Sequence, residues 1–381
     1  MALKVAARGR IPAFIVMDMM REANELAARG ENIVHLEIGQ PGTGAPRAVI
    51  EAAKAALDTD RLAYTDAFGL PDLRRQIAGH YRQKYGRNVP VERIVATTGS
   101  SAAFVLAFIA SFEPGDRVAL AEPGYPCYKN ILAALDIEPV ALPVGPAERF
   151  QPTVALLEAA GKLDGLILAS PSNPTGTMVD TGVFRALVDH CRRHGIRLIS
   201  DEIYHGITYD RPADTALAFT EDAVVINSFS KYYAMTGWRL GWMVVPEDLL
   251  RATECLCQNL YISPPTLSQR AAIAAFDCAA ELDGNVARYA RNRALLLDGL
   301  PKLGLDRLAP ADGAFYVYAD VAHLTNDSHD FCRRMLAEAG VAAAPGIDFD
   351  PARGAAYVRF SFAGTTEEVA EGLRRLGAWL A

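Results

Sequence analysis

The sequence lacks several features that would place it in other classes of protein. No apolar run reaches the roughly 18 residues of a membrane-spanning helix, and the N-terminal MALKVAARGRIPAF has no apolar signal-peptide core. Positive charge is also scarce, because 38 Lys and Arg stand against 45 Asp and Glu, a net charge of −7. We therefore expect a cytoplasmic protein that binds neither a membrane nor nucleic acid.

Cysteines are few and scattered, and no C-x-x-C pair occurs among Cys127, Cys191, Cys255, Cys257, Cys278 and Cys332. This spacing indicates neither a disulfide scaffold nor a zinc site, and we expect reduced, mostly buried thiols. His190 and His194 have a spacing that can bind metal. Arg192 and Arg193 lie between them and no carboxylate accompanies them, which favours a solvated helix face. We predict no metal site.

Apolar periodicity along the 381 residues predicts the order of helices and strands. A helix is expected over 14–29, a short strand over 33–39, and a helix over 71–85 that starts at Pro71 and stops before Gly86. From about residue 93, near-continuous apolar runs alternate with helices such as 180–194. The runs are RIVATT, RVALA, GLILA, RLIS, AVVIN and RLGWMVV.

This alternation predicts an α/β fold with a mostly parallel central sheet flanked by helices. Periodicity leaves open whether the last strand pairs antiparallel. After about residue 285 a long helix, AFYVYAD, a helix, AAYVRFSF and a terminal helix indicate a smaller α+β domain. We predict an N-terminal arm and helix over 1–45 that pack with this small domain, a large domain over 46–284, and a small domain over 285–381.

Four predicted strands are followed by polar residues. They lead into Gly99-Ser100-Ser101, into Asn173 within SPSNPTG, into Asp201 and Tyr204, and into Ser228, Ser230 and Lys231. Ligands of open α/β sheets bind beyond the carboxyl ends of the strands, so we expect these groups to lie together. Amides and hydroxyls at a helix start can bind phosphate, a carboxylate can keep a pyridine nitrogen protonated, and a lysine can form a Schiff base. The set suits pyridoxal 5′-phosphate (PLP).

Five segments in this chain resemble those of the class I/II aminotransferases, which are fold type I PLP enzymes of the aspartate aminotransferase-like superfamily. The segments are TTGSSAAF, EPGYPCY, SPSNPTGT, SDEIYHGI and SFSKYYAMTGWRLGW, in family order. The resemblance runs from about residue 10 to the C-terminus. It implies a large PLP-binding domain and a small domain, and an amino group moved from an L-amino acid to a 2-oxo acid by a ping-pong route.

The resemblance also implies a role for each matched residue. Lys231 would be the Schiff-base lysine and then the general base, and Asp201 would face the pyridine nitrogen. The remaining cofactor contacts would be Asn173 and Tyr204 at the ring oxygen, Tyr125 stacked on the ring, and Gly99, Ser100, Ser101, Ser228, Ser230 and Arg239 around the phosphate.

Arg359 stands inside the apolar strand AAYVRFSF, where a charge is costly unless it is paired or used. The residues alone favour an internal salt bridge, whereas the resemblance implies that Arg359 binds the substrate α-carboxylate, with Asn173 and the Gly39 backbone beside it. The best-known aspartate-specific subgroup has an arginine shortly before Tyr-x-x-Pro-Pro. This chain has Gln258 before Tyr261, and Ser101 where another subgroup has lysine. These departures favour a neutral or aromatic substrate over a dicarboxylate.

Two other interpretations share the same cofactor residues. One is a PLP-dependent carbon–sulfur β-lyase, and the other is a non-catalytic module such as the aminotransferase-like half of some transcription regulators. The acidic chain and the short segment before Ile11 argue against an added DNA-binding domain. A homodimer with shared sites is also implied, because Tyr64 matches the family tyrosine that reaches the cofactor phosphate of the neighbouring subunit.

Overall fold

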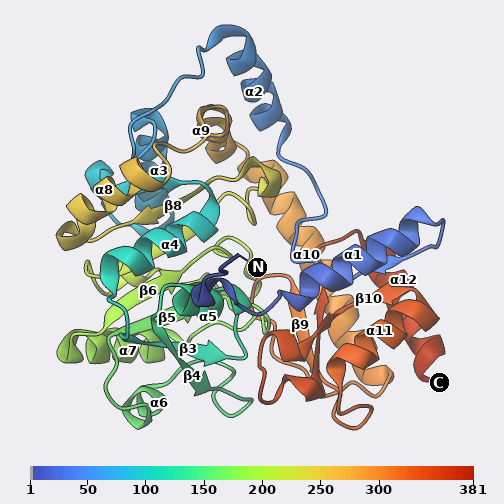
Figure 1. Cartoon of the computed structure of the whole chain (residues 1–381). Helices are drawn as coiled ribbons and strands as arrows, with labels where there is room; N and C mark the ends of the chain where they lie inside the picture. Colours follow the sequence, from blue (N-terminus) through green and yellow to red (C-terminus); the bar gives the residue numbers. More distant parts are fainter. Residues whose placement is uncertain (1–2) are drawn as a thin grey trace.

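A seven-stranded sheet forms the centre of the larger part of the molecule (Figure 1). The computed structural model describes residues 3–381. In spatial order the strands are β2 (Ile94–Thr97), β8 (Gly241–Val244), β7 (Val224–Ser228), β6 (Arg197–Asp201), β5 (Gly165–Ala169), β3 (Arg117–Glu122) and β4 (Glu138–Pro143). Strand β8 runs antiparallel to β2 and β7, and the other neighbours pair in parallel. The predicted mostly parallel sheet is confirmed.

Alternate residues of these strands enter two separate apolar layers. In β5, Leu166 and Leu168 belong to one layer and Ile167 to the other. The first layer includes side chains of α2 (Arg47–Thr59), α3 (Pro71–Tyr85), α6 (Val154–Ala159), α7 (Thr181–His194) and α9 (Thr266–Ile273). The second includes side chains of α4 (Gly99–Ser111), α5 (Pro126–Ala134) and α8 (Leu250–Leu260). Burial on both faces explains why the strand sequences are continuously apolar.

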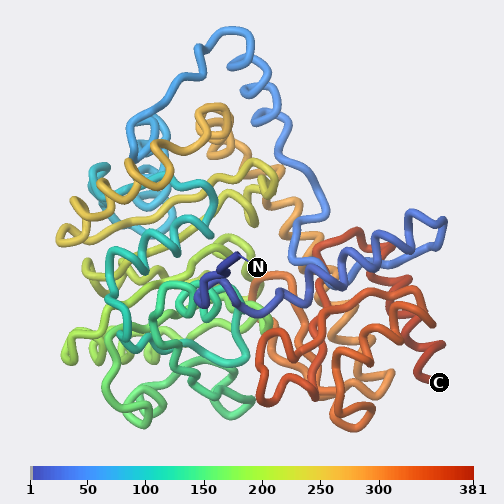
Figure 2. The backbone as a smooth tube through the Cα atoms, viewed as in Figure 1, coloured from blue at the N-terminus to red at the C-terminus, as the bar shows by residue number. Residues whose placement is uncertain are grey.

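The smaller part has two short sheets and four helices. Strands β11 (Ala344–Pro345), β12 (Tyr357–Ser361) and β9 (Tyr316–Asp320) pair antiparallel, and β1 (Val34–His35) pairs in parallel with β10 (Val341–Ala342). The helices are α1 (Ile15–Ala28), α10 (Ala279–Lys302), α11 (Ser328–Ala339) and α12 (Thr366–Leu380). Figure 2 follows the blue N-terminal segment to the red C-terminal part, where α1 packs on β10 and β11.

Several details differ from the sequence expectation. Strand β4 was not predicted, and only Val34 and His35 of the expected strand 33–39 pair with a neighbour. His190 is buried, at 4% exposed, so a solvated helix face is wrong for this residue. Its ring stacks on His194 with centroids 4.2 Å apart. The division at residues 45 and 284 stays a prediction, and α10 is continuous across the second boundary.

The six cysteines are free thiols, four of them buried. Among residues 3–381, no helix has both the length and the apolar character needed to cross a membrane. Within the same range, no cluster of three or more His, Cys, Asp or Glu side chains is placed to hold a metal ion.

Helix α3 offers a matched pair of glycine substitutions that tests its assigned ends. Gly79 lies inside the helix with open space around its Cβ position, whereas Gly86 caps the helix at a φ of +64°. We expect Gly79→Ala to stabilise the protein by about 0.5–1 kcal/mol, because alanine loses less backbone entropy. Gly86→Ala should destabilise it by about 1–2 kcal/mol, because a Cβ disfavours the left-handed conformation.

The measurement is the midpoint of thermal unfolding at equal PLP loading. The two variants should shift it in opposite directions. Equal shifts of the same sign would contradict the assigned end of α3.

Candidate active site

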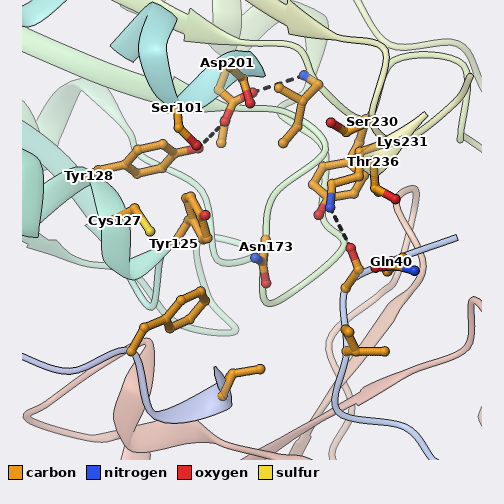
Figure 3. Close-up of a pocket in the computed structure, with 18 of the residues that line it drawn as sticks. Gln40, Ser101, Tyr125, Cys127, Tyr128, Asn173, Asp201, Ser230, Lys231 and Thr236 are labelled. Atoms are coloured by element: carbon orange, nitrogen blue, oxygen red, sulfur yellow. Dashed lines mark hydrogen bonds between the residues drawn. The ribbon is translucent and has the colours of Figure 1, made fainter. Parts of the chain in front are cut away.

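A cavity of about 310 Å³ lies where the carboxyl ends of β5, β6 and β7 face the smaller part of the molecule. Its lining brings together eleven of the residues singled out in the sequence: Gly39, Ser100, Ser101, Tyr125, Asn173, Asp201, Tyr204, Ser230, Lys231, Arg239 and Arg359. Figure 3 shows several of their side chains pointing into the same space from different elements. The expected meeting of strand ends is therefore observed.

One end of the cavity is rich in groups that can bind an anion. Ser100 and Ser101 lie in the first turn of α4, whose amides have no side-chain cap, and Arg239 lies beside them. Gly99 has a φ of +74°, and a Cβ there would stand 2.5 Å from Arg239 Nη2. A helix start with free amides, hydroxyls and a guanidinium is a set of donors that suits a phosphate.

Ser228 and Ser230 are linked by a hydrogen bond, 3.0 Å between their hydroxyl oxygens. Ser230 lines the cavity, whereas Ser228 does not and is almost fully buried at the end of β7. Gly99 also stays outside the lining, although it adjoins Arg239. Ser228 and Gly99 are therefore placed behind the residues that reach the cavity.

Lys231 projects into the cavity from the segment after β7, and its Nζ donates to the carbonyl oxygen of Gly39 at 2.5 Å (Figure 3). Burial lowers the pKa of Lys231 to about 8, helped by the positive charges of Arg359 and Arg239, while Asp201 acts in the opposite direction. A lysine with such a pKa is partly neutral near physiological pH. It can therefore act as a nucleophile toward an aldehyde or as a base.

Asp201 ends β6 as a fully buried carboxylate. It accepts hydrogen bonds from the Tyr128 hydroxyl and from the Ile203 amide, the latter at 3.0 Å. Burial raises the pKa of Asp201 to about 6, and these hydrogen bonds limit the rise. A buried carboxylate suits a protonated ring nitrogen as its partner. Tyr128 was missed in the sequence, although it is the last residue of the quoted EPGYPCY.

Arg359 lies in β12 and is 2% exposed. Its Nη1 donates to Asn173 Oδ1 at 2.8 Å and its Nη2 donates to the Glu37 carbonyl, while Nε has no partner. Among residues 3–381 no carboxylate forms a salt bridge with Arg359, so the internal salt bridge favoured by the residues alone is absent. A buried guanidinium without a counter-ion, facing a cavity, suits a carboxylate ligand.

Two tyrosines stand between the cofactor residues and Arg359. The hydroxyls of Tyr204 and Tyr316 are 2.6 Å apart. The guanidinium of Arg359 lies over the Tyr316 ring at 4.4 Å from its centroid. Tyr316 was not predicted as a site residue, because its place depends on the pairing of β9 with β12. A phenol hydroxyl of the Tyr204–Tyr316 pair would therefore be available to donate a hydrogen bond to the ring oxygen of the cofactor.

Most of the remaining cavity wall is apolar, although Gln40 and Thr236 also line it. Much of it comes from the N-terminal segment and α5, with Phe14, Val16, Met17, Met20, Cys127 and Ile131 in the lining. Phe14 packs edge-on against Tyr125 with ring centroids 5.8 Å apart. None of these residues was predicted to be at the site. The wall can contact an uncharged side chain, and it supplies no charge to a second carboxylate.

Tyr64 stands outside this cavity and is 80% exposed. Its loop is held by neighbouring segments, since the Thr65 amide donates to Ser263 Oγ at 3.4 Å and Thr266 donates to the Ala63 carbonyl. Tyr64 thus contributes nothing to the cavity of its own chain within residues 3–381.

Taken together, the donor set fits PLP. The phosphate would meet the start of α4 and Arg239, the ring nitrogen would meet Asp201, and the aldehyde would meet Lys231. The unpartnered Nε of buried Arg359 would then remain available to the α-carboxylate of the substrate.

Comparison with known proteins agrees with this chemistry. Residues 31–376 match the family described as aminotransferase class I and II. The chain is 53% identical to valine–pyruvate aminotransferase of Mycobacterium tuberculosis, covering 99% of this chain and 98% of that protein. It is 35% identical to (5-formylfuran-3-yl)methyl phosphate transaminase of Methanocaldococcus jannaschii, with 97% of each covered.

Solved structures give the same result. A crystal structure of an aminotransferase from Mycobacterium tuberculosis superposes with a TM-score of 0.98 at 53% identity, covering 100% of this chain and 99% of that one. Aspartate aminotransferase from Thermus thermophilus with maleate gives 0.93 at 31% identity, covering 99% and 100%. The predicted fold type, cofactor and reaction are confirmed. The chain therefore belongs to the class I and II aminotransferases, and it is a PLP-dependent enzyme that moves an amino group between an amino acid and a 2-oxo acid.

Proposed function

We propose that the preferred amino donor is a neutral aliphatic L-amino acid of about the size of valine, and that a small 2-oxo acid such as pyruvate accepts the amino group. The observation that carries this proposal is the composition of the cavity lining. Its basic residues are Lys231, Arg239 and Arg359, and the wall away from the cofactor groups is mostly apolar, with the uncharged side chains of Gln40 and Thr236 as its polar members. The 53% identical relative named valine–pyruvate aminotransferase supports the same choice.

Each basic residue already has a task in this proposal. Arg239, with Ser100, Ser101 and Ser230, holds the cofactor phosphate, supported from behind by Gly99 and Ser228. Lys231 holds the cofactor aldehyde, and Arg359 binds the substrate α-carboxylate. No basic side chain in the described lining is left for a second carboxylate. Gln258 lies exposed on α8, outside the cavity, where its amide bonds Glu254.

When bound, PLP supplies an electron sink that makes the α-proton of the amino acid removable. Asp201 sustains this property because its buried carboxylate keeps the ring nitrogen protonated, and Tyr128 holds that carboxylate in place. Tyr204 and Asn173 would donate to the ring oxygen, and Tyr125 would cover the ring face. We assign the proton transfer at the α-carbon to Lys231 Nζ, whose low pKa permits it to accept a proton near neutral pH.

Arg359 orients the substrate for that transfer. A guanidinium binds a carboxylate through two parallel hydrogen bonds, which fixes the direction of the α-carbon as well as its distance. Asn173 and the Glu37 carbonyl hold the guanidinium from two sides. We place the backbone of Gly39 next to the same carboxylate, since Gly39 lines the cavity and its carbonyl already meets Lys231.

We further propose that the working unit is a homodimer with shared sites. Tyr64 is exposed and does not line its own cavity. A second groove, lined by Gly42, Thr43, Trp238, Arg239 and Pro265, opens beside the phosphate end. A partner's Tyr64 entering there would add one hydroxyl donor to the phosphate.

The substrate proposal predicts an order of specificity constants. With the PLP form, valine and leucine should convert the cofactor to its amino form with a kcat/KM at least about tenfold above that of aspartate, since an unpaired carboxylate in an apolar wall costs more than 1.4 kcal/mol. Stopped-flow absorbance of the half-reaction measures this. A kcat/KM for aspartate above that for valine would refute the proposed substrate class.

A second prediction concerns pH. In the cofactor-free protein the pKa of Lys231 is lowered to about 8, so its amine is mostly protonated below pH 8 and neutral above it. Because only the neutral amine attacks an aldehyde, the rate of covalent PLP attachment should rise with pH through a midpoint near 8. Attachment is followed by absorbance and by the mass of the borohydride-fixed protein.

Lys231→Ala is the control for this experiment, and it should fix no PLP at any pH. If the attachment rate were the same at all pH values between 7 and 9, Lys231 would not be the residue that binds PLP covalently. The same conclusion would follow if borohydride fixed PLP to the variant.

The dimer proposal predicts complementation between two defective chains. Lys231→Ala lacks the lysine, and Tyr64→Ala should lose cofactor affinity. In a mixed dimer one shared site carries both defects and the other carries neither. Activity should therefore rise above both parents after subunit exchange, measured with valine and pyruvate.

Exchange itself is followed with differently tagged chains. If tagged mixed dimers form and activity stays at the parental level, Tyr64 acts within its own subunit.

A further inference from the structure

The first turn of α1 is capped by a carboxylate from the far end of the chain. Phe14, at the N-cap position, offers no side-chain acceptor. Instead, the amide of Ile15 donates to Asp348 Oδ1 at 3.1 Å and the amide of Val16 donates to Asp348 Oδ2 at 3.0 Å. Asp348 is only 6% exposed, so both oxygens of a buried carboxylate are committed to this helix.

Helix α1 has two apolar faces. Met19 and Ala23 are buried within the smaller part of the molecule. Val16, Met17 and Met20 line the active-site cavity, where Val16 is buried and Met17 is 49% exposed. A methionine left open to a cavity can adapt its flexible side chain to an apolar ligand. The position of α1 therefore sets the position of the wall that meets the substrate side chain.

The two ends of α1 are held by different contacts. Beyond its C-terminal end, β1 pairs with β10, and Arg375 Nη1 donates to the Asn32 carbonyl at 2.5 Å. At its N-terminal end the side-chain acceptor is Asp348. Loss of the Asp348 carboxylate would therefore release the first turn, with Phe14 and Met17, and leave the other end attached.

The residue after Asp348 reaches the carboxylate anchor. Phe349 lies under the guanidinium of Arg359, at 4.8 Å from the ring centroid. It also packs in the same apolar cluster as Val16. Asp348 thus holds the first turn of α1, and the adjacent Phe349 contacts the arginine that we assign to the α-carboxylate.

We propose that Asp348 is a positioning residue that sets the range of substrate side chains, by holding the first turn of α1 at a fixed distance from Arg359. This inference rests on the proposed function of the site. With the turn fixed, the wall formed by Phe14, Met17 and Met20 packs around an aliphatic side chain. A methyl group is too short to depend on that wall, so alanine should be insensitive to its position.

The experiment compares Asp348→Ala with the wild-type holoenzyme across alanine, valine and leucine. Loss of a cap and of the ordered wall should raise KM for valine and leucine about tenfold. KM for alanine should change less than about twofold, and kcat for all three should change little, because Lys231 keeps its place and Arg359 keeps its hydrogen bonds to Asn173 and the Glu37 carbonyl. PLP stoichiometry, read from absorbance, should match the wild type.

The matched control is Asp327→Ala. Asp327 caps α11 through a single oxygen of an exposed carboxylate, Oδ1, which accepts from the amides of His329 and Asp330 at 3.0 Å, and it does not line the cavity. This variant also loses a helix cap and should leave the ratio of KM values between valine and alanine unchanged. Asp348→Asn keeps the shape with one acceptor oxygen and should give an intermediate ratio, which keeps the test usable if Asp348→Ala fails to fold.

A second readout is independent of turnover. Amide hydrogen exchange at Ile15 and Val16 should quicken in Asp348→Ala and stay unchanged in Asp327→Ala. The positioning role would be overturned if KM rose equally for alanine and valine in Asp348→Ala. It would also be overturned if the ratio of these two KM values stayed at the wild-type value although amide exchange became faster. Wild-type enzyme that fails to use valine would instead overturn the proposed substrate class, and this inference with it.

Discussion

The site depends on one electrostatic constraint, which is the burial of the Arg359 guanidinium without a carboxylate partner. A lone buried cation is costly, and the protein offsets this with Asn173, the Glu37 carbonyl and the face of Tyr316. These partners are neutral, so the charge stays available to an acidic ligand. The same charge, after burial itself, helps to lower the pKa of Lys231. In the proposed function, Arg359 would thereby both bind the substrate carboxylate and lower the pKa of the nucleophile Lys231.

Burial also raises the pKa of two adjacent carboxyls at the end of β6. Asp201 has the Tyr128 hydroxyl and a backbone amide, and its pKa is raised to about 6. Glu202, the next residue, is buried, and its Oε1 accepts from Ser200, Thr215 and Ala216, while Oε2 accepts no hydrogen bond and lies 3.4 Å from His205 Nδ1. The pKa of Glu202 is raised to about 8. Of these adjacent carboxyls, Asp201 lines the cavity and is the one that we assign to the cofactor, whereas Glu202 lies outside the lining.

Patterns within one segment of the sequence predicted those strands and site residues that are determined by that segment alone. Buried apolar runs located β2, β3, β5, β6, β7 and β8, and the motifs located Lys231, Asp201 and Arg359. Strand β4 escaped because its EPVALP is mostly exposed and carries two prolines. Tyr316 and the α1 residues of the cavity wall were not predicted, for another reason. Their places depend on the register of β9 with β12 and on Asp348, which lies 332 residues from Val16. No periodicity within one segment encodes such contacts.

The long-range contacts are also those that join the two parts of the molecule at the site. Arg359 and Tyr316 come from the smaller part, whereas Asn173, Asp201, Tyr204 and Lys231 come from the larger one. The Arg359–Asn173 and Tyr204–Tyr316 hydrogen bonds cross between them. Helix α1 adds the apolar wall from the smaller part. The residues to which we assign cofactor binding thus lie mainly at the sheet edge, whereas Arg359 and the α1 side of the apolar wall come from the other part. On this assignment, α1 and its Asp348 cap would change the range of substrates while the residues assigned to PLP keep their places.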